Sequence, residues 1–149
     1  MKKTKEIEQA GTVVPPLLLQ QVKLGDAAAS ALKLLFCGCE TWAWDGHCGV
    51  RLFALVDVAD GGLPYPAAAA VTVDMDPDTV ELRTYSVNPG FPAGLLTGRL
   101  VSGIADRLRA AGTKRLVVAS AGDDEQAARL EAAGFVEPFP GARWREIAL

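Results

Sequence analysis

Apolar positions follow two periods along this chain, and the switches between them predict its elements. From Leu96 to Leu108 every fourth residue is Leu or Ile, which is the buried stripe of an amphipathic helix over residues 95–111. Short runs of apolar and β-branched residues predict strands instead. Three such runs precede the helix, at residues 50–58, 68–75 and 79–87. Because Asp76-Pro77-Asp78 leaves only a turn between the last two, they should form an antiparallel hairpin.

The N-terminal third is less regular. Residues 1–14 have no clear period and predict a frayed arm or an edge strand. From Leu17 to Phe36 the apolar residues recur mainly at helical spacings after Pro15-Pro16, a pair that can open a helix. Two short helices, divided near Gly25-Asp26, are therefore expected.

The C-terminal third alternates between strand and helix. Residues 115–119 predict a buried strand, and Asp123 with Gln126 resembles a capping box that opens a helix running to Ala133. Closing strands are expected at residues 135–137 and 143–147. A hairpin combined with a strand–helix–strand unit predicts an α/β fold, with a mixed central sheet and helices on both faces.

Composition narrows the class of protein. The chain has 149 residues, of which 50% are hydrophobic and 22% charged, as expected for one globular domain over residues 1–149. A net charge of −3 gives no broad electrostatic basis for binding nucleic acid. No apolar run approaches the ~20 residues that cross a membrane, so no membrane partner is expected. The odd number of cysteines, 3, argues for a reducing compartment, and a cytoplasmic location is predicted.

The segment from Thr79 to Ala110 has the chemistry of a phosphate site. Its strand runs into a loop of proline and small residues, and the loop into a helix whose first N–H groups and dipole favour an anion. Ala93 and Gly94 allow a ligand to approach the backbone closely, and Arg99 lies about one turn into the helix. The plain alternative is a strand-to-helix turn that binds nothing.

Two adjacent stretches, Val87-Asn88-Pro89-Gly90-Phe91 and Pro92-Ala93-Gly94-Leu95-Leu96-Thr97, carry a family resemblance. The first is similar to the Val-Asp-Pro-aromatic end of the fourth strand in GNAT N-acetyltransferases. The second stands where that family has an Arg/Gln-Gly-x-Gly-x-Gly/Ala loop, which wraps the pyrophosphate of coenzyme A. Pro92 replaces the leading Arg or Gln, and Ala93 and Leu95 replace the first two glycines, so the motif is kept only in part.

A later stretch, Asp123 to Phe135, is similar to the family's second signature, Asn-x-x-Ala-x-x-Leu-Tyr-x-x-x-Gly-Phe. Leu130 occupies the position of a Tyr that in many members protonates the leaving thiolate. The resemblance covers roughly residue 50 to the C-terminus. It implies acetyl-CoA or another acyl-CoA as co-substrate, held where the fourth and fifth strands splay apart. The residues it assigns to this ligand are Ser86, Val87, Pro92, Ala93, Gly94, Leu95, Leu96, Thr97, Arg99 and Asp123.

The resemblance also implies the reaction, attack of a neutral amine on a thioester, which needs a proton acceptor and a donor for the sulfur. Glu81 is the candidate base, because it lies early on the fourth strand, where some members, including histone acetyltransferases, have a catalytic Glu. Tyr85 and Ser120 are candidate donors, and Ser120 could instead contact pantetheine. The plain alternatives are a solvated Glu81 and a Tyr85 that packs on the sheet.

Cys37, Cys39, His47 and Cys48 form a cluster of soft ligands, but their spacings differ from those of zinc sites, so no structural metal is predicted. Trp42 and Trp44 beside them could wall an acceptor pocket or form a partner-binding patch.

Two functions stay open at this level. The first is N-acyl transfer, most simply of acetyl, to a small-molecule or peptide amine in a ternary complex. The second is a GNAT-like module that binds acyl-CoA or a protein partner without turnover, which the missing Tyr and the eroded loop favour. A third is an α/β domain of another kind with a different phosphate ligand. The acceptor, the acyl chain and the assembly, a homodimer included, are not fixed by the sequence.

Overall fold

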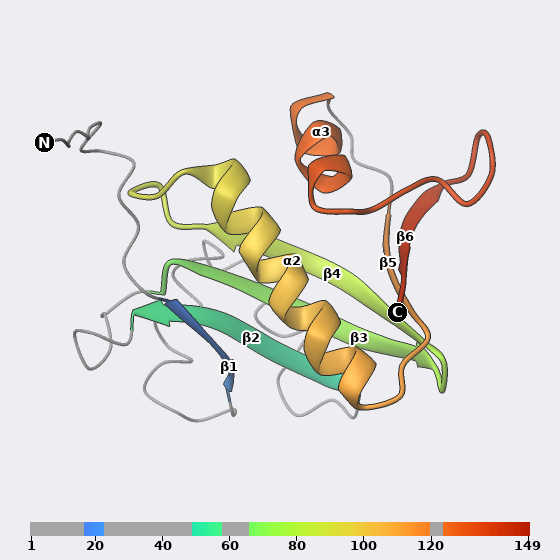
Figure 1. Ribbon diagram of the computed structural model, residues 1–149, viewed down its shortest axis with the longest axis horizontal. Coiled ribbons are helices and arrows are strands. Elements are labelled where there is room, and N and C mark those ends of the chain that lie inside the picture. Colours follow the sequence, from blue (N-terminus) through green and yellow to red (C-terminus); the bar gives the residue numbers. More distant parts are fainter. Residues whose placement is uncertain (1–16, 23–48, 58–65, 120–123) are drawn as a thin grey trace, which may run out of the picture.

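The computed structural model describes residues 17–22, 49–57, 66–119 and 124–149. Figure 1 shows how their strands and helices are arranged. The strands are β1 (Leu17–Val22), β2 (Val50–Asp57), β3 (Ala68–Asp76), β4 (Thr79–Val87), β5 (Arg115–Ala119) and β6 (Trp144–Ala148). The helices are α2 (Ala93–Ala110) and α3 (Asp124–Ala132).

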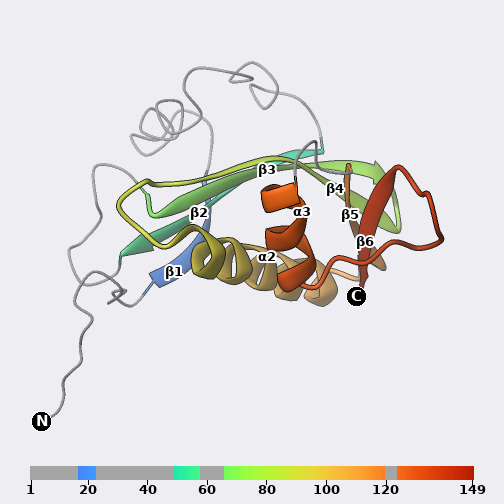
Figure 2. The ribbon, with the colours of Figure 1, turned by 90° about the horizontal axis from the view of Figure 1, so that it is seen from above.

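The strands form one 6-stranded sheet in the order β1-β2-β3-β4-β5-β6. All neighbours are antiparallel except β4 and β5, which are parallel and are connected through α2. Figure 2 shows α2 and α3 on the same side of this sheet. The predicted α/β fold with a mixed sheet is therefore confirmed. Of the two short helices predicted within residues 17–36, the second, after Gly25-Asp26, lies outside the described residues.

The first strand lies where the sequence predicts a helix. Helical spacing predicts a helix from Leu17 onward, but Leu17–Val22 pairs antiparallel with β2 and places Leu19 opposite Leu55. Leu19 is buried on the α2 side of the sheet, whereas Val22 belongs to a separate apolar cluster with Leu52. Burial on both faces of a strand breaks the simple alternation, so the pattern resembles that of a helix.

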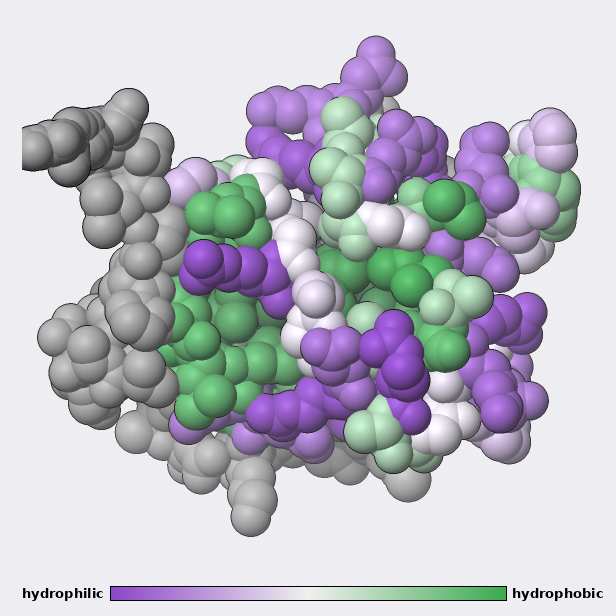
Figure 3. All heavy atoms as spheres, in the orientation of Figure 1, coloured by the Kyte–Doolittle hydropathy of each residue, from purple (hydrophilic) through white to green (hydrophobic). Residues whose placement is uncertain are grey.

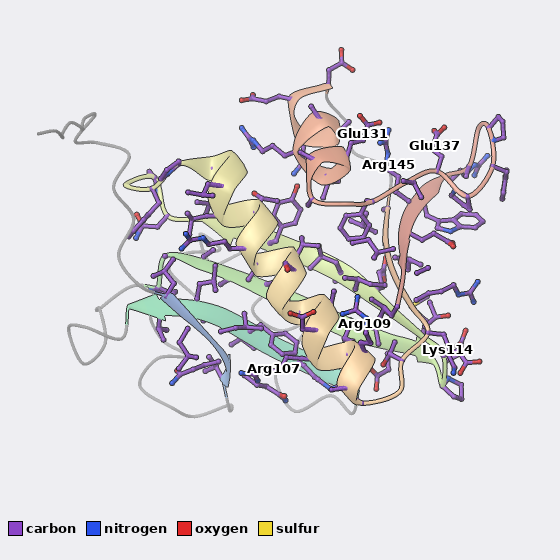
Figure 4. All side chains as sticks on the ribbon, in the orientation of Figure 1. Arg107, Arg109, Lys114, Glu131, Glu137 and Arg145 are labelled. Atoms are coloured by element: carbon purple, nitrogen blue, oxygen red, sulfur yellow. The ribbon has the colours of Figure 1, made fainter. Side chains whose placement is uncertain are left out.

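Helix α2 holds this edge strand in place. The Arg107 Nη2 atom donates a hydrogen bond to the carbonyl oxygen of Leu19, and Figure 4 shows Arg107 near the end of α2. A Cβ atom added to Gly103 would lie 3.1 Å from Leu19 Cδ2, which means that the strand and the helix approach closely there. The absence of a side chain at this position permits the contact.

The main core lies between the sheet and α2, as the leucine stripe predicts. Leu96, Leu100, Ile104 and Leu108 are all buried in it. The helix begins at Ala93, however, so the prediction that Ala93 and Gly94 are in a loop is wrong. Pro92 is the N-cap residue, with an extended backbone (φ −66°, ψ 116°), and its carbonyl accepts the first intrahelical hydrogen bond, from the N–H of Leu96.

The predicted C-terminal strands and helix are confirmed, with one exception at residues 135–137. Residues 135–137 contribute only an isolated bridge, Val136 to Glu146, instead of a strand. Arg145 Nη1 donates to Glu131 Oε2 at 2.6 Å, which ties β6 to α3 (Figure 4). No helix in the described ranges is long and apolar enough to cross a membrane.

Candidate functional site

The sheet opens between β4 and β5. The two strands pair over only three positions, from Thr79 opposite Arg115 to Glu81 opposite Val117. Beyond them β4 continues to Val87 with no partner on this side among the described residues, and the two strands diverge (Figure 1). The resemblance predicts such a splay, and the structure contains it. The second half of β4 thus presents backbone N–H and C=O groups along an open edge.

A β-bulge lies near the point where the strands separate. In the β3–β4 register Thr72 faces Leu82 and Val71 faces Thr84, so Arg83 is the extra residue. The extra residue reverses the alternation of side chains. As a result Val80, Leu82, Tyr85 and Val87 all pack toward the α2 side, although their spacing changes from even to odd positions.

The loop after β4 is organised by Asn88. Its N–H donates to the carbonyl of Ala67 and its side-chain amide to the carbonyl of Pro66. Its Oδ1 accepts a hydrogen bond from the N–H of Gly90 at 3.0 Å, and its carbonyl accepts one from Phe91. Asn88 therefore fixes the path of the loop by local bonds of the kind that Asn commonly makes in turns. We did not predict this role, although the run Asn88-Pro89-Gly90 is a turn signal.

The loop leads into the N-terminus of α2, whose first backbone N–H groups have no partner within the helix. The N–H groups of Ala93, Gly94 and Leu95 precede the first intrahelical bond, which runs from Leu96 N–H to the Pro92 carbonyl at 3.1 Å. No side chain caps them, and the first turn contains no acidic residue. A Cβ atom added to Gly94 would have no heavy atom within 4 Å, so the approach is open. These features suit an anion such as a pyrophosphate.

The other residues of the loop motif have different positions. Leu96 is fully buried, and its N–H is already bonded within the helix. The buried Thr97 hydroxyl donates to the carbonyl of Ala93 at 2.7 Å. Arg99 is exposed and lines a shallow hollow of about 590 Å³ between α2 and β1, together with Gly94 and Leu95. Figure 3 shows hydrophobic surface over this part of the molecule. The donors available to an anion therefore belong to the first turn.

Glu81 lies at the apex of the splay, on the sheet face away from α2. Its Oε1 accepts two hydrogen bonds from Arg83, from Nε at 2.9 Å and from Nη2 at 2.8 Å. Glu81 also lines a hollow of about 420 Å³, which Val117, Ala119 and Trp144 share. The candidate base is therefore next to an open space, with a guanidinium beside it.

The remaining predicted residues are placed apart from Glu81 or are not described. Tyr85 packs against the core on the α2 side, so it lies on the face opposite Glu81. Leu130 is only 1% exposed and is part of the same core. Ser120 and Asp123 lie outside the described residues, as do Cys37, Cys39, His47, Cys48 and the two tryptophans, Trp42 and Trp44. Within the described ranges no three His, Cys, Asp or Glu residues are grouped as metal ligands.

Three solved structures resemble this chain across most of its length. The ribosomal-protein-S18-alanine N-acetyltransferase of Escherichia coli is 19% identical, with a TM-score of 0.67, and the match covers 89% of this chain and 94% of that one. A GNAT family acetyltransferase of Elizabethkingia anophelis with acetyl-CoA bound is 14% identical, with a TM-score of 0.66 and coverages of 89% and 98%. A Bacillus subtilis acetyltransferase in complex with CoA is 11% identical, with a TM-score of 0.66 and coverages of 90% and 99%.

Sequence comparison adds nothing to this likeness, since no family model and no curated protein matches the chain. The structural likeness agrees with the parallel crossover through α2, the short β4–β5 pairing and the open edge of β4. The chain therefore has the fold of the GNAT acetyltransferases.

Proposed function

We propose that this protein binds an acyl-CoA, most simply acetyl-CoA, and transfers its acyl group to an amine. The observation that supports this most is the combination of the β4–β5 splay with three free N–H groups at the start of α2. Two of the solved structures with the same fold contain acetyl-CoA or CoA. In our proposal the pyrophosphate lies against Ala93, Gly94 and Leu95, and the acyl end reaches the apex at Glu81.

The length of β4 agrees with these two positions. Glu81 and Val87 are six residues apart on this strand, which at ~3.3 Å per residue is roughly 20 Å. An extended pantetheine arm spans a distance of this order along the open edge of β4. Its amide groups would hydrogen-bond the edge of β4 beyond Glu81, where the pairing with β5 ends, in place of a neighbouring strand.

The chemistry assigned to Glu81 is that of a general base. The amine nitrogen attacks the thioester carbonyl carbon, an amide bond forms and the carbon–sulfur bond breaks. Glu81, directly or through water, takes the proton that the amine loses. Leu130 has no proton to donate, so in this proposal the departing sulfur is protonated from solvent. Arg83 would have to yield part of its contact with Glu81 when the amine arrives.

A second candidate is an acyl-CoA-binding module without turnover. Two observations favour it: the family's Tyr position is a core leucine with 1% exposure, and the Glu81 carboxylate already accepts two hydrogen bonds from Arg83. This candidate uses the same site at the start of α2. It differs from the enzyme only at the apex of the splay.

A thermal-shift panel tests the proposal. Acetyl-CoA, longer acyl-CoAs, free CoA and nucleotides are added separately, because a ligand that binds the folded state raises the melting temperature. The proposal predicts a shift with CoA compounds that exceeds the shift with ATP. Mass spectrometry with mixed amines then detects transfer. Binding without transfer to any amine supports the second candidate, and no shift with any CoA compound contradicts both.

A further inference from the structure

Two arginines without a carboxylate partner line the hollow beside Glu81. Five other arginines in the described ranges form ion pairs with carboxylates: Arg51, Arg83, Arg109, Arg129 and Arg145. Arg115 and Arg143 both line this hollow, and neither has a carboxylate of the described residues within ion-pair distance. Arg115 Nη2 donates only to Thr79 Oγ1, at 2.9 Å.

The carboxylates that line the hollow have partners other than these two arginines. Glu81 and Asp76 are the carboxylates that line it. Glu81 is already paired with Arg83, and Asp76 accepts a hydrogen bond from the N–H of Asp78 at 2.8 Å. Neither carboxylate forms an ion pair with Arg115 or Arg143, so both guanidinium groups are available to an anionic group on a ligand.

Part of the wall of the hollow is apolar. Trp144 and Met75 line it and are both partly exposed, at 38% and 57%. The Trp144 Nε1 atom donates to Glu146 Oε1 at 3.1 Å, and its ring meets Phe139 edge-on with centroids 5.3 Å apart. These contacts hold the Trp144 ring, whose flat face suits the carbon chain of a small molecule.

We propose that the acceptor is an amine that also carries a carboxylate, of the size of an amino acid or a short peptide. This inference rests on the acyl transfer proposed above and names its substrate class. The amine lies at Glu81, and the carbon skeleton packs on Trp144. The carboxylate is bound by the guanidinium of Arg143, with Arg115 as a second donor. Guanidinium groups suit this role because they bind a carboxylate through two parallel hydrogen bonds.

The test compares amino acids with their primary amides, which keep the amine and lose the negative charge. Acetyl transfer from acetyl-CoA is measured for both series with the wild type, Arg143→Gln, Arg115→Gln/Arg143→Gln and the control Arg109→Gln. Arg109 is a suitable control, since it lies on α2 and pairs with Asp106. We expect the acids to react with a kcat/KM about 10- to 100-fold above that of the amides, because charge-assisted hydrogen bonds are lost. The double variant should lose this preference, and the control should keep it.

A second readout needs no turnover. N-acetylated amino acids and their amides are titrated by calorimetry into the protein saturated with CoA, and the acids should bind more tightly only when Arg143 and Arg115 are present. Wild type that treats acids and amides alike, in transfer or in binding, overturns the inference and leaves the acyl transfer standing. Wild type that does not bind acetyl-CoA at all overturns both.

Discussion

The two ends of β4 differ in the chemical groups that they offer to a ligand. At the Val87 end the groups available to a ligand are backbone N–H groups, which the start of α2 supplies whatever its side chains are. At the Glu81 end the groups are side chains, namely a carboxylate, guanidinium groups and an indole. A sequence can lose much of a glycine motif at the first end and keep its chemistry. At the second end one substitution changes what the site can do.

This contrast explains why the eroded loop weakens the case for binding less than it first suggests. Ala93 and Leu95 replace glycines of the family motif, yet both are in the first turn of α2 with their N–H groups free. The open space around Gly94 is kept. Leu130 is the opposite case, since a buried leucine cannot replace the chemistry of a tyrosine hydroxyl.

The largest expected effect is at the side-chain end. Glu81→Gln keeps the shape of the residue and removes the base, so kcat should fall by about 10²–10⁴-fold with little change in acetyl-CoA affinity. Steady-state kinetics with a responsive amine, together with calorimetry, separates the two quantities. An unchanged kcat would remove Glu81 from the reaction and favour the module without turnover.

The next largest effect is expected when Leu130 is replaced by the tyrosine of the family motif. Leu130 is 1% exposed and packs in the main core, so Leu130→Tyr should lower the free energy of unfolding by about 1–3 kcal/mol through overpacking. We expect no gain in kcat. Denaturant unfolding measures the first quantity, with Leu130→Met as a control that keeps the volume. A stable variant with raised kcat would show that the leucine replaced an accessible donor.

The smallest expected effect is on the stability of the sheet that contains β4. Thr72 is fully buried, and its Oγ1 has no hydrogen-bond partner among the described residues. Thr72→Val keeps the branched shape and removes the unsatisfied hydroxyl, so the free energy of unfolding should rise by up to about 1 kcal/mol. Chemical denaturation of the variant checks this, and Thr79→Val is the contrast, because Thr79 accepts a hydrogen bond from Arg115. A loss of stability at Thr72 would mean that its hydroxyl is satisfied.

The sequence predicts strands at residues 50–58, 68–75, 79–87 and 115–119 and the buried stripe of α2, because each of these segments has one clear period. It fails at Leu17–Val22, where both faces of a strand are partly buried. It also fails at Ala93 and Gly94, since the run Pro92-Ala93-Gly94 resembles a loop although a helix begins directly after the proline.

The candidate site was predictable only in part. The candidate anion site at the start of α2 follows from the local sequence pattern, because the strand, loop and helix are contiguous. The hollow of Glu81 does not, since it is formed by β3, β4, β5 and the segment around Trp144, which are distant in the sequence. The bulge at Arg83 is likewise a consequence of strand pairing, and no residue of β4 predicts it.

The central claim is that the start of α2 binds the pyrophosphate of acyl-CoA, and calorimetry with acetyl-CoA tests it most directly. Gly94→Asp places a carboxylate at the free N–H groups, while Ser102→Asp places the same charge eight residues further along α2, about 12 Å away. Both positions are exposed, so both variants should fold. The account predicts binding by wild type and Ser102→Asp and affinity reduced about 10-fold or more in Gly94→Asp. Equal affinity in all three proteins, or no binding by the wild type, would contradict it.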